Sequence, residues 1–151
     1  MGAAGRKLVG VGVGLLLVAA CATRTDGPPE ITVDKTACSQ CGMLISELAY
    51  AAAYRVPGAE GRAFDDIGCL LAAARQEPGA APHFWFHDAA GSGWIAGTSA
   101  VFVTSPSLRT PMGGAVVAYR HRSDADRAAA THRGEVIASL PALLARTGGK
   151  S

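Results

Sequence analysis

A short apolar stretch near the start of the chain most constrains what the rest can fold into. Arg6 and Lys7 precede an uncharged apolar run over residues 8–20, which contains three glycines. A membrane-spanning helix needs about 20 apolar residues, so this run is too short to span comfortably. It has the length of the apolar region of a secretory signal, about 7–15 residues. Residues 1–20 are therefore expected to be a cleaved leader.

The end of this leader resembles a bacterial lipoprotein signal. The sequence Leu17-Val18-Ala19-Ala20-Cys21 is similar to a lipobox, in which cleavage precedes the cysteine and its thiol receives a lipid. This implies lipidation of Cys21, a flexible tether over residues 21–30 containing Pro and Gly, and a folded domain over residues 31–147. The protein would be lipid-anchored in the bacterial cell envelope and face the periplasm. Ala22, which is not aspartate, favours the outer membrane.

Charge and motif content exclude several functions. Without Arg6 and Lys7 the 14 basic residues become 12, equal to the 12 acidic residues. A nucleic-acid-binding protein needs a basic stripe, and none is present. The common nucleotide-binding and hydrolase motifs are also absent, and no paired carboxylates or Ser/His/Asp set suggest catalysis. We therefore expect neither nucleic-acid binding nor enzymatic activity.

The remaining chain shows a coarse pattern that occurs twice, in candidate halves of about 34–90 and 91–146. Each has a turn with methionine beside glycine, followed by strand, helix and strand signals. These patterns predict an α+β fold of two similar ββαβ-type units packed into one small domain. The expected strands cover residues 48–56, 83–87, 100–104, 115–121 and 135–139, and the expected helices cover residues 67–75 and 125–132. Asp65-Asp66 and Ser123-Asp124 are expected to cap the helices, and Pro78-Gly79 to end the first one.

The cysteines and methionines are the strongest candidates for chemistry. Cys38 and Cys41 are two residues apart, which suits a disulfide, a redox pair or half of a metal site. Met43 follows closely, and Met112 lies in a second glycine-rich turn at residues 110–114. Thiolate and thioether ligands together favour Cu(I) over hard cations.

Three other candidates have a structural interpretation beside a functional one. Cys69 is expected to lie in the core of the first helix, because buried cysteine behaves as a small apolar residue. His83 and His87 face the same side of a strand and are candidates to complete a copper site, although paired surface histidines are common.

Three motifs, taken in their order along the chain, resemble the NosL family. They are Cys38-x-x-Cys41-Gly42-Met43, Phe64-Asp65-Asp66-Ile67-Gly68-Cys69-Leu70 and Thr110-Pro111-Met112-Gly113-Gly114. These are lipoprotein accessory factors of nitrous-oxide reductase. The resemblance implies a periplasm-facing Cu(I) chaperone whose metal is held by Cys41 and Met112. Met43 would be a third ligand or a neighbour, and Cys38 an additional thiol. The implied partners are copper-free nitrous-oxide reductase and its ABC-type maturation complex.

Two alternatives use the same cysteines differently. A periplasmic thiol–disulfide oxidoreductase would use Cys38 and Cys41 as its redox pair, although such a pair needs its first cysteine at a helix N-terminus. A structural zinc module would need four ligands, and the sequence shows no second ligand pair.

Overall fold

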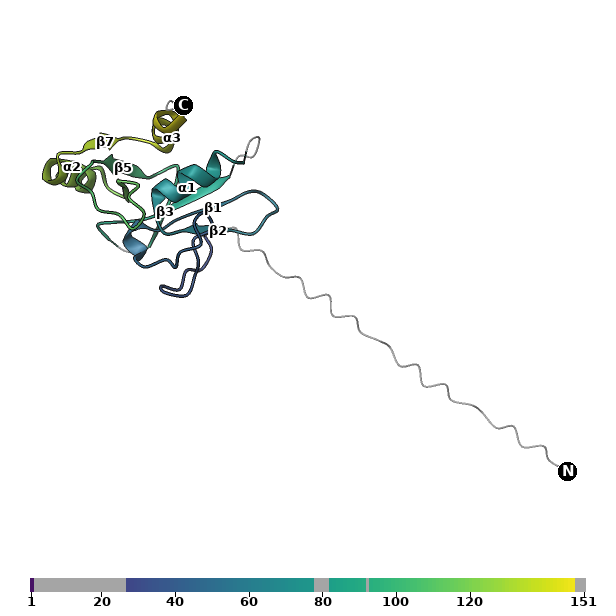
Figure 1. The fold of residues 1–151 in the computed structure, drawn as a ribbon. Coiled ribbons are helices and arrows are strands. Elements are labelled where there is room, and N and C mark those ends of the chain that lie inside the picture. Colours follow the sequence, from purple (N-terminus) through teal and green to yellow (C-terminus); the bar gives the residue numbers. More distant parts are fainter. Residues whose placement is uncertain (2–26, 78–81, 92, 149–151) are drawn as a thin grey trace.

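The computed structural model describes Met1 and residues 27–77, 82–91 and 93–148 (Figure 1). The predicted leader, Cys21 and most of the predicted tether lie outside the described residues, as do Pro78 and Gly79. Within the described part of the chain, no helix has the length and apolar character needed to cross a membrane.

The first half of the chain forms a four-stranded antiparallel sheet in the order β2-β1-β3-β4. Its strands are β1 (Ala52–Arg55), β2 (Arg62–Phe64), β3 (His83–His87) and β4 (Trp94–Ala96). Ala52 of β1 pairs with Phe64 of β2 on one side and with Phe86 of β3 on the other, which sets the register of these three strands. Because successive side chains of a strand point to opposite sides, the paired residues lie on the same face of the sheet.

The second half forms a three-stranded antiparallel sheet in the order β6-β5-β7. The strands are β5 (Val101–Thr104), β6 (Val116–Tyr119) and β7 (Glu135–Ile137). In both sheets the first strand is central, and a helix connects its two neighbours. The α+β class is thus confirmed. An internal duplication of the two units stays a prediction.

The helices are α1 (Ile67–Ala74), α2 (Arg122–His132) and α3 (Leu140–Gly148), and a short 3-10 turn, η1, covers Leu48–Tyr50. Figure 1 shows α1 lying along the first sheet, and α2 beside β5 and β7. Helix α1 packs on β1 and β2 and also reaches β6 of the second sheet. Helix α1 therefore lies where the two halves of the chain meet.

One apolar core connects the two sheets. Phe86 of β3 and Phe102 of β5 meet edge to face at 4.8 Å between ring centroids, and both are fully buried. Residues of α1 and α3 complete this core. The opposite face of the second sheet packs against Ala125 and Ala129 of α2. Ile45, from the segment before β1, covers the opposite face of the first sheet.

Several predicted elements differ from those observed. The strand expected at residues 48–56 begins only at Ala52, because η1 occupies its first part. Strands β2 and β4 were not expected, since three-residue strands are too short to show a period of two. Helix α3 was also not expected.

Helix α2 begins earlier than the predicted caps at Ser123 and Asp124 allow. Its N-cap is His121, whose side chain makes no capping hydrogen bond, so the prediction of the cap was wrong. Asp124 lies in the first helical turn and pairs with Arg127, while Arg122 pairs with Asp126 at 2.7 Å. An acidic residue in the first turn also interacts favourably with the helix dipole. These interactions favour continuing the helix through the expected cap.

The end of α2 provides a test of stability. The exposed Arg133 has φ 50° and ψ 42°, the left-handed conformation that glycine adopts without steric cost. We expect Arg133→Gly to raise the free energy of unfolding by about 0.5–1 kcal/mol, because it removes this backbone strain. Urea unfolding followed by circular dichroism checks this. Arg133→Ala, which keeps the strained conformation, is the control and should not stabilise the protein.

Candidate metal centre

A tight turn brings Cys38 and Cys41 together. The Cys38 N–H donates to the Met43 carbonyl at 2.7 Å, and the Gly42 N–H donates to the Cys38 carbonyl at 2.9 Å. Gly42 has φ +78°, a conformation that side chains other than glycine rarely adopt. The glycine of this motif is therefore needed for the turn that places the two thiols side by side.

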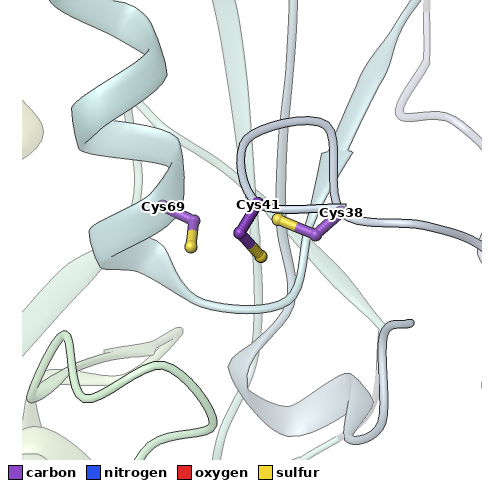
Figure 2. Close-up of side chains that lie close together, drawn as sticks. All are labelled: Cys38, Cys41 and Cys69. Carbon is purple, nitrogen blue, oxygen red and sulfur yellow. The ribbon is translucent and has the colours of Figure 1, made fainter. Parts of the chain in front are cut away.

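Helix α1 adds a third thiol. Asp66 is the N-cap of α1, and Cys69 lies in the first turn. The Sγ atoms of Cys38, Cys41 and Cys69 all lie within 4.8 Å of one another. Figure 2 shows the three sulfurs gathered between the turn and the start of the helix. We refer to these three side chains as the thiol group.

The thiol group has one side open to solvent. Cys38 is 2% exposed and Cys69 is 9% exposed, whereas Cys41 is exposed. All three cysteines are free thiols, so Cys38 and Cys41 do not form a disulfide here. An ion held between the sulfurs would rest on the apolar core and remain reachable from the Cys41 side.

The prediction that Cys69 belongs to the core is correct, but it misses the second property of this residue. Cys69 is buried within the main core, and its sulfur also faces the other two thiols. Its separation from Cys41 in the sequence gave no spacing signal. Only the packing of α1 against the turn reveals that it is a candidate ligand.

The environment distinguishes the acidities of the two buried thiols. Burial acts to raise the pKa of Cys38, but hydrogen bonds from the backbone of Asp65, Cys41 and Gln40 and from the Cys41 side chain together lower it. Burial raises the pKa of Cys69, and the nearby charges of Cys38 and Cys41 raise it further. Of these two buried thiols, Cys38 therefore loses its proton more readily. A bound metal cation would favour ionisation of Cys69, since the thiolate is the form that binds metals.

Two consecutive carboxylates attach both methionine-containing segments to the start of α1. Asp65 Oδ1 accepts a hydrogen bond from the Ser46 N–H at 2.9 Å, which holds the segment after Met43. Asp66 Oδ2 accepts from the Met112 N–H at 3.1 Å, which holds the second glycine-rich turn. Asp66 is thus the predicted cap, whereas Asp65 contacts a distant segment instead of capping the helix.

The two methionines predicted as ligands, Met43 and Met112, are exposed at the surface. Met43 is 59% exposed and Met112 is 44% exposed. Neither methionine therefore fills a gap in the core. The backbone of Met112 is held at the end of α1 that carries Cys69, whereas its role and that of Met43 as ligands stay predictions.

The histidine pair does not form a site. His83 and His87 lie four residues apart on β3, a separation of roughly 13 Å along a strand. Trp85 lies between them and stacks on His83 at 6.2 Å, while His87 packs on Trp94. Burial lowers the pKa of His87. The two rings are therefore too far apart to bind one ion together.

The geometry also bears on the two alternative functions. Among the described residues, no histidine, carboxylate or further cysteine joins the thiol group as a fourth ligand. Zinc would therefore lack its usual four protein ligands. Cys38 lies outside any helix, between the isolated bridge at Ala37 and a turn. A thioredoxin-like redox pair would instead have its first cysteine at a helix N-terminus.

The fold and site define a small α+β protein with a three-thiol group suited to a soft metal ion. The NosL family model matches residues 29–140, and the chain belongs to the NosL family. The structure is similar to the copper chaperone NosL from Shewanella denitrificans, with a TM-score of 0.61 and 19% sequence identity. This similarity covers 74% of the present chain and 93% of that protein. Comparison with the curated proteins gave no match.

Proposed function

We propose that the protein is a copper chaperone that binds Cu(I) at the thiol group and transfers it by ligand exchange. The observation that carries this proposal is the convergence of three free thiols within 4.8 Å, two of them buried and one exposed. Sulfur ligands select Cu(I) over hard cations. An acceptor thiolate or imidazole can approach the ion from the Cys41 side and displace one ligand, so no catalytic turnover is required.

Met112 and Met43 would contribute thioether ligands or shield the bound ion. This part of the proposal rests on the resemblance of the two glycine-rich motifs to the family pattern and on the attachment of both segments to the start of α1. A neutral thioether binds Cu(I) without adding charge. It would therefore be easier to displace than a thiolate.

The proposed acceptor is copper-free nitrous-oxide reductase, reached through its ABC-type maturation complex. Family membership supports this choice. The proposed location is the periplasmic side of the cell envelope, with a lipid on Cys21 as anchor and the outer membrane as its position. The support for this location is the lipobox-like sequence before Cys21.

The choice of metal can be tested directly. Anaerobic titration of the purified protein is expected to show tight binding of about one Cu(I) per chain and poor retention of Zn(II), because the ligands are soft and a fourth is missing. Native mass spectrometry gives the stoichiometry. Tightly held zinc without Cu(I) uptake would contradict the proposal and favour a structural zinc site.

The anchor can be tested separately from the metal. Cys21→Ala is expected to abolish lipidation and to release the protein from the membrane fraction, because no described helix can hold it there. The measurement is fractionation with detection of the protein by immunoblot. Cys41→Ser is the control, since it also replaces a cysteine but should remain membrane-bound. A Cys21→Ala protein that is cleaved and still membrane-bound would rule out lipid anchoring at this residue.

A further inference from the structure

The side chain of Asp66 makes more hydrogen bonds than a helix cap requires. It is fully buried, and its Oδ1 accepts from the Gly68 N–H at 2.6 Å, which is the capping bond. Its Oδ2 accepts three further bonds, all from the turn of residues 110–114. The donors are the Thr110 hydroxyl at 2.5 Å, the Met112 N–H at 3.1 Å and the Gly114 N–H at 3.2 Å.

The backbone around these bonds is packed without space for side chains. A Cβ atom on Gly68 would lie 2.8 Å from the Gly114 Cα. A Cβ on Gly114 would lie 2.0 Å from Asp66 Oδ1 and 2.8 Å from the Gly68 nitrogen. Two glycines distant in the sequence thus let the turn approach α1 closely enough to reach a single carboxylate.

The same helix end also contacts the thiol group. Cys69 follows Asp66 by three residues in the first turn of α1. The backbone amide of the adjacent Asp65 faces the Cys38 thiol and helps to lower its pKa. Adjacent residues therefore join the turn that carries Met112 to two of the three cysteines.

We propose that Asp66 is a positioning residue of the copper site: its carboxylate holds the 110–114 turn against α1 so that Met112 can complete the sulfur ligand set formed by the thiol group. This inference rests on the proposed function. A ligand on an exposed turn contributes to affinity only if the turn is already ordered, because ordering it on binding would weaken affinity. The hydrogen bonds of Asp66 provide that order before copper arrives.

The test is a double-mutant cycle on Cu(I) affinity in the full-length, processed protein, measured by competition with a Cu(I) chelator. Met112→Leu and Asp66→Asn are each expected to weaken binding by about 10- to 100-fold, the size found for residues that orient metal ligands. The amide of Asn cannot accept all four bonds. The double variant should lie within about threefold of Met112→Leu alone, since Asp66 acts through Met112.

Asp88→Asn is the matched control for losing a buried carboxylate. Asp88 is also buried, but it accepts from the Ala90 N–H and pairs with Arg120. This variant should bind Cu(I) as the wild type does. If Asp66→Asn does not fold, Thr110→Val replaces it, because it removes one donor to Asp66 and keeps the carboxylate. Thr110→Ser retains the hydroxyl and should restore affinity.

The outcomes separate this inference from the proposed function. Independent losses that multiply in the double variant would overturn it, because Asp66 would then act without Met112. Unchanged affinity in Met112→Leu would also overturn it, while Cu(I) binding by the cysteines would leave the chaperone function intact. Absence of Cu(I) binding by the wild type would contradict the proposed function itself.

Discussion

Cys41→Ser is expected to weaken Cu(I) binding by at least about 100-fold, equivalent to about 3 kcal/mol of binding free energy. The substitution replaces a soft, ionisable sulfur with a hard hydroxyl that does not ionise at neutral pH. Cys41 is the exposed member of the thiol group, so its loss leaves no unfilled space in the core. The measurement is anaerobic competition against a Cu(I) chelator of known affinity, with circular dichroism to confirm folding.

Ser39→Ala is the matched control for this experiment. Ser39 is an exposed residue of the same turn. Its N–H donates to the Ala63 carbonyl and its carbonyl accepts from Arg62, and the substitution preserves both backbone groups. Its Cu(I) affinity should equal that of the wild type. Wild-type affinity in Cys41→Ser would show that copper is held without the exposed thiol. That result would contradict the ligand-exchange route proposed for transfer.

Gly114→Ala is expected to lower the free energy of unfolding by about 3–5 kcal/mol. Its Cβ would overlap the Asp66 carboxylate and the backbone of α1, and neither is the flexible end of a side chain. Overpacking of this kind costs about 1–3 kcal/mol, and each buried hydrogen bond that breaks as the turn moves away adds about 1–3 kcal/mol. Thermal and urea unfolding followed by circular dichroism measure the change.

The neighbouring glycine separates this clash from ordinary backbone strain. Gly113 has φ +72°, and a Cβ there would have nothing within 4 Å. Gly113→Ala should therefore cost only about 1–2 kcal/mol, the strain of a left-handed residue. If Gly114→Ala were no more destabilising than Gly113→Ala, the close contact between the turn and α1 would not exist in solution.

Some elements of the fold could be predicted because their signals are local. Strand β3 has the predicted bounds of residues 83–87, and α1 ends one residue before the predicted residue 75. The first combines β-forming aromatic residues, and the second begins at an aspartate that caps it. By contrast, β2 and β4 are strands only because β1 and β3 offer their edges for pairing.

The candidate metal site could likewise be predicted only in part from the sequence. The proximity of Cys38 and Cys41 follows from their spacing and from the glycine turn between Cys41 and Met43. The candidacy of Cys69 as a ligand could not be predicted, because its neighbours in the sequence are those of any buried helix residue. The histidines were candidates on spacing alone, beside the commoner interpretation as surface residues, and an extended strand separates them by roughly 13 Å.

Residue types and their spacing were enough to predict the α+β class, the two glycine-rich turns and the soft-ligand character of the chemistry. These depend on residue type and short spacing: glycine permits the turn at Gly42, and sulfur favours Cu(I) whatever surrounds it. The meeting of the three thiols and the attachment of the Met112 turn to the same helix end become evident only in the folded chain. Both depend on the approach of segments far apart in the sequence. The buried Asp66 carboxylate and the absence of side chains at Gly68 and Gly114 let the Met112 turn approach α1.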